Sequence, residues 1–352
     1  MVKVQLNDVE KRYGPTVALA PTNLSVTEGE FLTLLGPSGS GKTTLLNIVS
    51  GMTEPTGGEV WIDGVDVTNV PSAKRGLGMV FQSYALMPHM TIFQNIAFPL
   101  QIRGLPREEI RRKVEDVLEL VQLPHVAGRK PKELSGGQQQ RIALARCIVY
   151  DPSIILMDEP LGALDKKLRE QMQLEIKRLQ VQLGITMLYV THDQEEAMTM
   201  SDRIILMNNG SAEQIGTPNE LYFQPNSSFV ADFIGQSNLL DATVAGEDRV
   251  RLVNGEIITV RHDAPLSHGQ SVKVLLRPEV LHLREIDAGG NRLDATIRGS
   301  VISGSTVKHF LELDGGTSVL VEELSNGTNA APAPGDRVTI SWSVGQARVL
   351  PA

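Results

Sequence analysis

The sequence contains a single cysteine, Cys147, among its 352 residues, so the chain cannot form an intramolecular disulfide. A reducing compartment fits this cysteine usage best. The N-terminal residues lack the apolar core of a secretory signal, and no segment approaches the ~18 apolar residues that a membrane-spanning helix needs. The longest apolar runs, such as residues 204–207, are only as long as a strand. We therefore expect a chain that does not itself cross a membrane.

The sequence also lacks an excess of basic residues, because 33 Lys and Arg face 41 Asp and Glu, for a formal net charge of −8. Nucleic-acid binders usually carry a basic excess or a basic face, and membrane-surface anchors are often polybasic. We expect neither kind of protein. The remaining composition, 41% hydrophobic and 21% charged, is ordinary for a globular protein.

Strand-like and helix-like segments alternate over residues 1–235. The strand candidates are rich in Val, Ile and Leu without polar alternation, as buried parallel strands are. Helical spacing of apolar residues predicts helices over 107–122 and 164–183. The alternation predicts an α/β domain with a mainly parallel sheet. The strand candidates are residues 31–35, 78–81, 154–157, 187–191 and 203–207.

Helical periodicity is absent after residue 235, where short apolar runs are separated by Gly, Asn and Asp clusters. Residues 236–352 are therefore expected to form an all-β domain, a small barrel of the oligonucleotide/oligosaccharide-binding type. An exposed loop is expected over 326–335. The strand candidates are residues 257–260, 272–276, 307–313, 318–321 and 338–342.

A phosphate-binding loop is indicated by Gly-Pro-Ser-Gly-Ser-Gly-Lys-Thr at residues 36–43. It follows an apolar strand candidate and precedes a helix candidate over 44–49, the context in which backbone N–H groups and a helix N-terminus surround phosphates. Lys42 would contact the β- and γ-phosphates, and the Thr43 hydroxyl would bind Mg²⁺. The loop thus predicts a site for ATP and Mg²⁺. Its candidate nucleotide ligands are Gly36, Ser38, Gly39, Ser40, Gly41, Lys42, Thr43 and Thr44.

Two carboxylates, Asp158 and Glu159, directly follow the apolar strand candidate 154–157. Taken alone, such a pair usually marks only the end of a strand. After a phosphate loop, however, it favours a catalytic site in which Asp158 binds the metal. Glu159 would then orient and deprotonate the attacking water.

A second anion site is indicated by Leu-Ser-Gly-Gly-Gln at residues 134–138, which opens a helix candidate extending over 142–149. With this pentapeptide before an Asp-Glu strand end, the sequence resembles the ATP-binding-cassette ATPases. The resemblance implies that two copies pack head to tail. Each copy would then use Ser135, Gly136, Gly137 and Gln138 to close over the ATP bound to the other.

The remaining motifs of that family occur in order. Gln82 matches the glutamine that links metal and water to the partner interface, and His192 matches the histidine that contacts the γ-phosphate. Residues 162–165 match the loop that crosses the dimer and ends in Asp165. Its first residue is commonly Ser, so Gly162 is a departure, which we do not expect to abolish activity. Tyr13 matches the aromatic residue that stacks on adenine.

The cassette motifs alone leave open what the ATPase drives. A soluble cassette ATPase of nucleic-acid or translation metabolism is the main alternative to a membrane importer. Chromosome-type cassettes insert long coiled coils between the phosphate loop and the Leu-Ser-Gly-Gly-Gln turn, whereas here Gln82 and Leu134 are only 52 positions apart. Translation-type proteins carry two cassettes in one chain, and this chain has one. An adapter with a decayed site is disfavoured because Lys42, Asp158 and Glu159 are present.

Importer features occur on both sides of the Leu-Ser-Gly-Gly-Gln segment, which we call the signature turn. Residues 84–100 are apolar and Met-rich. In importers the equivalent stretch opens a helical subdomain, here expected at about residues 85–152, and binds a coupling helix of the membrane subunit. We expect two permease subunits to dock near Met87–Ile92, although an apolar stretch of this kind could also be plain core. Arg-Pro-Glu at 277–279 resembles a strand end of the accessory β domain of sugar, polyamine and iron importers. Residues 233–240 look closest to the polyamine and opine branch, and a generic interdomain linker would account for them equally well.

The resemblance also implies a cellular location and further partners for such a subunit. It would lie peripherally on the cytoplasmic face of the inner membrane. A periplasmic or lipid-anchored binding protein would deliver the solute to its permeases, and no nucleic acid would be involved. Neither that binding protein nor the permeases are part of this sequence, so the solute stays open.

Overall fold

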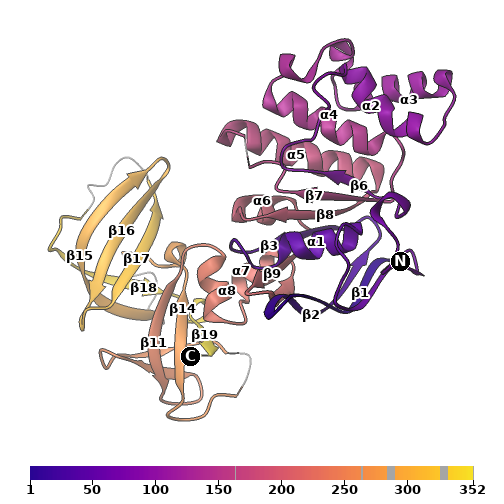
Figure 1. The fold of residues 1–352 in the computed structure, drawn as a ribbon. Coiled ribbons are helices and arrows are strands. Elements are labelled where there is room, and N and C mark those ends of the chain that lie inside the picture. Colours follow the sequence, from indigo (N-terminus) through magenta and orange to yellow (C-terminus); the bar gives the residue numbers. More distant parts are fainter. Residues whose placement is uncertain (163, 263–264, 284–289, 326–331, 352) are drawn as a thin grey trace. The chain divides into compact units, whose positions relative to one another are not determined.

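The computed structural model forms two compact units, Met1–Pro218 and Asn219–Ala352 (Figure 1). Each unit has its own hydrophobic core. No helix in the described part of the chain is both long enough and apolar enough to span a membrane. The described residues are 1–162, 164–262, 265–283, 290–325 and 332–351.

A six-stranded sheet forms the centre of the first unit, in the order β10-β9-β3-β8-β7-β6. All neighbouring strands are parallel except β10 and β9. The predicted α/β domain is confirmed, and each predicted strand is present with bounds that differ by one residue at most. The strands are β3 (Phe31–Leu35), β6 (Gly78–Val80), β7 (Ile154–Asp158), β8 (Thr186–Thr191), β9 (Arg203–Asn208) and β10 (Ser211–Gly216).

Different elements cover the two faces of this sheet, because alternate side chains on both faces are apolar. Leu156 and Leu188 pack with α1 (Lys42–Ser50), whereas Met157 and Tyr189 pack with the remaining helices of the unit. Three of these helices, α2 to α4, lie within residues 85–152. The helices are α2 (Ile92–Ile102), α3 (Arg107–Leu120), α4 (Gly136–Ile148), α5 (Lys166–Leu183) and α6 (Gln194–Met200).

The helix bounds differ from the predicted ones where a capping residue or a left-handed residue intervenes. α5 begins at Lys166 rather than at residue 164, because Asp165 caps it and accepts a hydrogen bond from Leu168 N at 3.0 Å. α3 ends before residue 122, because Gln122 has a φ of 61°. α4 begins at Gly136, directly after its cap Ser135, so the Ser-Gly-Gly turn opens a helix as predicted.

An antiparallel sheet in the first unit was not predicted. Its order is β2-β1-β4-β5, and its long strands are shifted in register at several points. These irregularities interrupt the alternation of polar and apolar residues by which strands are recognised in a sequence. The strands are β1 (Val2–Tyr13), β2 (Thr16–Thr27), β4 (Gly57–Ile62) and β5 (Val65–Asp66).

The single cysteine lies in the core of the first unit. Cys147 is 4% exposed, and its Sγ donates a hydrogen bond to the carbonyl oxygen of Met79 at 3.1 Å. Burial raises the pKa of the thiol to about 11. The side chain is therefore a protonated thiol at neutral pH.

The second unit is β-rich, as predicted for residues 236–352, and follows α7 (Pro218–Phe223) and α8 (Ser228–Phe233). Its strands form two sheets, β13-β12-β11-β14-β19 and β17-β16-β15-β18, around a core that includes Trp342. Residues 326–331 of the expected loop lie outside the described residues. The strands are β11 (Asn238–Val244), β12 (Arg249–Leu252), β13 (Ile257–Thr259), β14 (Ser271–Leu276), β15 (Asn291–Ser303), β16 (Thr306–Leu313), β17 (Ser318–Leu324), β18 (Arg337–Trp342) and β19 (Arg348–Pro351).

Arg277 connects the segment before residue 235 to this β-rich unit. Its buried guanidinium donates hydrogen bonds to the carbonyl oxygens of Tyr222 at 2.8 Å and Ala231 at 2.9 Å, and lies 4.2 Å from the Tyr222 ring centroid. A buried guanidinium needs such acceptors, so these contacts hold α7 and α8 to β14. The domain boundary at residue 235 stays a prediction.

Candidate functional site

The candidate site lies at one edge of the parallel sheet. β3 and β7 both pair in parallel with β8, so the carboxyl ends of the three strands meet at this edge. The phosphate loop follows β3, Asp158 ends β7, and His192 follows β8. Parallel pairing thus brings together residues that are more than a hundred positions apart, and this is the edge where open α/β sheets bind ligands.

Glycines of the phosphate loop are required by close backbone approach. A Cβ on Gly36, which has a φ of 152°, would lie 2.2 Å from the carbonyl oxygen of Met207. A Cβ on Gly41, with a φ of 99°, would lie 2.7 Å from the carbonyl oxygen of Ala18. Both positions therefore need glycine, because the neighbouring strands leave no room for a side chain.

Lys42 lies within the loop, at the start of α1. Its Nζ donates hydrogen bonds to the carbonyl oxygens of Gly36 and Pro37, both at 2.8 Å. Burial lowers the pKa of this ammonium, and the carboxylates of Glu159 and Asp158 act in the opposite direction. A cation held by loop carbonyls is placed to exchange them for phosphate oxygens.

Thr43 and Asp158 form the candidate metal site. Thr43 Oγ1 donates a hydrogen bond to Asp158 Oδ1 at 3.3 Å, and burial raises the pKa of Asp158 while this hydrogen bond opposes the rise. Hydroxyl and carboxylate oxygens are the hard donors that suit Mg²⁺. Across the described ranges, no three His, Cys, Asp or Glu side chains gather as a metal-binding group.

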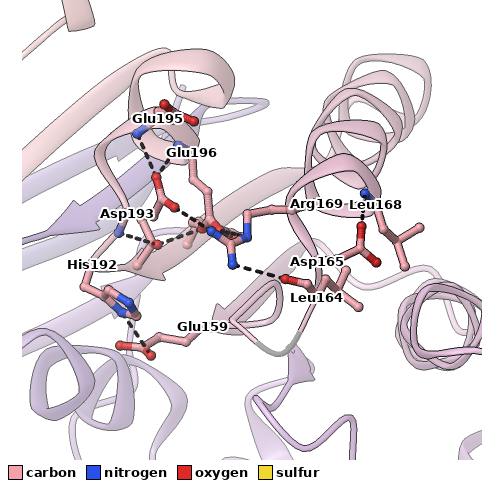
Figure 2. A network of polar contacts seen from close by, with 11 residues as sticks. Glu159, Leu164, Asp165, Leu168, Arg169, His192, Asp193, Glu195 and Glu196 are labelled. Carbon is pink, nitrogen blue, oxygen red and sulfur yellow. Dashed lines mark hydrogen bonds and ion pairs between the residues drawn. The ribbon is translucent and has the colours of Figure 1, made fainter. Parts of the chain in front are cut away.

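Glu159 and His192 face each other across the site (Figure 2). His192 Nδ1 lies 3.3 Å from Glu159 Oε2, and the side chains are 60% and 26% exposed respectively. Glu159 has a φ of 44°, and its N–H donates to the carbonyl oxygen of Val190 on β8 at 3.0 Å. A left-handed residue at a strand end turns the chain, and here it directs the carboxylate toward the histidine.

Gln82 and the loop that ends in Asp165 lie near Glu159. Gln82 is exposed in a turn after β6, and a Cβ on Gly162 would lie 3.8 Å from Gln82 Nε2 and 3.7 Å from the carbonyl oxygen of Glu159. Ala163 lies outside the described residues. The structure thus brings Gln82 close to the start of the crossing loop, while Asp165 caps α5.

Replacing Gly162 by Ser is expected to keep the ATPase rate within about two-fold of the original. The added Cβ would meet only ordinary van der Waals contacts, at 3.7 Å and 3.8 Å, and the glycine has no left-handed φ. Steady-state phosphate release of Gly162→Ser is the measurement. A loss beyond ten-fold would mean that the departure from the family's serine is itself functional.

The Leu-Ser-Gly-Gly-Gln turn forms the N-terminus of α4. Ser135 and Gln138 make a reciprocal capping box, with N···O distances of 3.4 Å and 3.1 Å. A Cβ on Gly137 would lie 2.9 Å from Leu168 Cδ1 of α5, so this glycine permits close helix packing. α4 and α1 lie on opposite sides of β7 and β8 in Figure 1.

Tyr13 ends β1 and is 55% exposed, with Lys11 Nζ 5.1 Å from its ring centroid. It pairs with Thr16 in the hairpin whose second strand passes the phosphate loop at Ala18. An exposed ring on such a hairpin is available for stacking, and its role stays a prediction.

Three residues near His192 were missed in the sequence analysis. Arg169 of α5 and Asp193 form an ion pair of 2.9 Å, and Glu196 of α6 is 2% exposed beside them. No spacing signal could have found this set, because ordinary helix residues occupy two of the positions and only the folded chain brings them together.

Comparison with known proteins identifies the family. The model of the ABC transporter family matches residues 19–162, and that of the TOBE domain matches residues 274–350. A spermidine/putrescine import ATP-binding protein of Haemophilus influenzae is 47% identical, covering 99% of this chain and 96% of its own. A protein of the same description from Rubrobacter xylanophilus is 45% identical, covering 99% and 94%.

Solved structures that resemble this chain also come from ABC transporter proteins. A cbiO1 structure from Clostridium perfringens, described as part of an ABC transporter complex, has a TM-score of 0.60 at 26% identity and covers 63% of this chain and 91% of its own. The ATP-binding cassette MJ0796, in a dimeric structure with ADP and phosphate, has a TM-score of 0.55 at 38% identity, covering 61% and 98%. The expected cassette and accessory β domain are thereby confirmed, and this chain belongs to the family of ABC transporter ATP-binding proteins that carry a TOBE domain.

Proposed function

We propose that the chain is the ATP-hydrolysing subunit of a polyamine importer that takes up compounds such as spermidine or putrescine. The observation that carries the ATPase is the meeting of Lys42, Asp158 and the Glu159–His192 pair at one sheet edge. The solute class rests on full-length similarity to relatives described as spermidine/putrescine importers. Nothing in the site favours the alternative in nucleic-acid or translation metabolism.

The site residues divide into three tasks in this proposal. Lys42 and the loop N–H groups bind the phosphates. Thr43, Asp158 and Gln82 would hold Mg²⁺, which would neutralise charge on the phosphates. Glu159 accepts the proton of the attacking water, and His192 contacts the γ-phosphate. The further nucleotide ligands are Tyr13, Gly36, Ser38, Gly39, Ser40, Gly41, Thr44, Ser135, Gly136, Gly137, Gln138 and Asp165.

A second copy completes the site. The position of α4 across the sheet from α1 supports an arrangement in which the signature turn closes over the ATP bound to another chain. The dimeric MJ0796 cassette with ADP and phosphate supports this arrangement. Closure around two ATP molecules would bring the helical subdomains together, and hydrolysis would release them.

The segment proposed to contact the permeases precedes α2. Asn95, which is fully buried, holds it by accepting a hydrogen bond from Met87 N at 2.7 Å and donating to the carbonyl oxygen of Thr91 at 3.0 Å. Ile92 is also fully buried, so Met87–Thr91 offers the accessible part. Docking there would place the chain on the cytoplasmic face of the membrane, with a binding protein delivering solute from the other side.

Uptake by the native host tests the proposal. Deleting the gene should reduce uptake of radiolabelled spermidine or putrescine to background, and the original gene should restore uptake. Glu159→Gln, produced at equal level, should not restore it, because transport needs repeated hydrolysis. Unchanged uptake of both polyamines in the deletion strain would contradict the solute class, and loss of maltose or ferric-iron uptake instead would reassign it.

A further inference from the structure

Arg169 connects the crossing loop to the turn that carries His192 (Figure 2). Its Nη2 donates a hydrogen bond to the carbonyl oxygen of Leu164 at 3.1 Å, in the residue before Asp165. Its Nη1 lies 2.9 Å from Asp193 Oδ2. One planar guanidinium therefore bonds to a backbone atom of the loop and to the residue that directly follows His192.

The turn at His192 is fixed on both sides of the histidine. Asp193 Oδ1 accepts hydrogen bonds from Glu195 N at 2.8 Å and Glu196 N at 3.3 Å, at the start of α6. The N–H of Asp193 donates to Thr191 Oγ1 at 3.0 Å. A displacement of Asp193 would therefore move the backbone from which the His192 ring extends toward Glu159.

Glu196 adds a second carboxylate to this network. Its Oε2 accepts hydrogen bonds from the hydroxyls of Tyr189 and Thr191, both at 2.7 Å, and its Oε1 lies 3.7 Å from Arg169 Nε. Burial raises the pKa of Glu196, and the hydrogen bonds from Thr191 and Tyr189 oppose this rise. Asp193 adds to the rise, and Arg169 also opposes it. Arg169 is the cation that compensates these two neighbouring carboxylates, so its position and theirs depend on each other.

We propose that Arg169 is a positioning residue that transmits the state of the crossing loop to His192, so that arrival of a second copy at the loop activates hydrolysis. This inference rests on the proposed dimeric ATPase. A partner that moves the Leu164 carbonyl oxygen displaces the guanidinium that is bonded to it. The displaced guanidinium then moves Asp193, and with it the adjoining His192. In this proposal Arg169 acts through Leu164 and Asp193 rather than on the nucleotide itself.

Arg169→Lys in the full-length chain tests the inference, because lysine keeps the charge but cannot bond to both partners at once. ATPase activity is measured across protein concentrations, from dilute chain to saturating dimer. At high concentration we expect kcat to fall about ten-fold with KM nearly unchanged, within the usual range of coupling effects. In dilute samples the variant and the original should differ by less than about two-fold, because no partner acts on the loop.

Two further variants separate positioning from a loss of folding. Asp193→Asn keeps an oxygen for the N–H groups of α6 but removes the charge that binds Arg169, and it should show the same concentration-dependent loss. Lys177→Gln is the matched control, because it removes another ion pair of α5, with Asp202 at 2.8 Å, and should leave activity unchanged. Thermal unfolding of all variants is followed in parallel.

The possible results are distinct. Equal rates of Arg169→Lys and the original chain at every concentration would overturn the inference, as would an equal loss in dilute and concentrated samples. Failure of the proposed function gives another result, in which the original chain shows no ATPase activity or no rise of specific activity with concentration. If Arg169→Lys does not fold, Asp193→Asn decides by the same criterion.

Discussion

Glu159→Gln is expected to lower the ATPase rate by about 100-fold or more while ATP binding is retained. The amide has nearly the same shape as the carboxylate but cannot accept the proton of the attacking water. Its oxygen can take the place of Oε2, which lies 3.3 Å from His192 Nδ1, so the local geometry should persist. Phosphate release and nucleotide binding measure the two effects, and light scattering with ATP should show a trapped dimer.

Glu195→Gln is the matched control for this variant. Glu195 is an exposed carboxylate at the start of α6, three residues after His192, and its side chain has no part in the proposed chemistry. Its removal should leave both the rate and the dimerisation unchanged. Normal turnover by Glu159→Gln would remove Glu159 from the role of base.

Lys42→Ala is expected to weaken ATP binding by about 10- to 100-fold, which is the range for losing a charge-assisted contact to phosphate. The ammonium lies in the phosphate loop, and the loop carbonyls that now hold it would lose their donor. ATP titration by fluorescence or calorimetry measures the affinity. Thermal unfolding should show a smaller ATP-induced rise of the melting temperature than in the original chain.

Lys113→Ala serves as the control for Lys42→Ala. Lys113 pairs with Asp151 at 2.6 Å in the helical part of the first unit and lies outside the phosphate loop. Its loss should not change ATP affinity. Equal ATP affinity of Lys42→Ala and the original chain would contradict the assignment of the phosphate loop.

The sequence could predict those parts of the site whose chemistry depends on residues close together in the chain. The phosphate loop, the Asp158-Glu159 pair and the signature turn each carry their information within eight residues, and their strand and helix context is local. The structure places the first two at one sheet edge. Their mutual distances depend on parallel pairing of β3, β7 and β8, which follows from the fold class.

The remaining features depend on contacts that no local pattern records. Gly36 needs to be glycine partly because Met207, far along the chain, places its carbonyl oxygen beside it. Arg169 matters because α5 and the turn after β8 come together in the fold. The antiparallel sheet escaped prediction because shifts of register in β1 and β2 interrupt the alternation of side chains.

The buried state of Cys147 makes the chain convenient for spectroscopy. Because its thiol is protonated and shielded, thiol-reactive dyes and spin labels will find no exposed native cysteine, and the sequence contains no other. A cysteine introduced on the surface would carry the label without prior removal of Cys147, whose replacement would disturb the packing between α4 and β6. Approach of two copies during ATP binding could thus be followed by interchain distances in a chain with only one substitution.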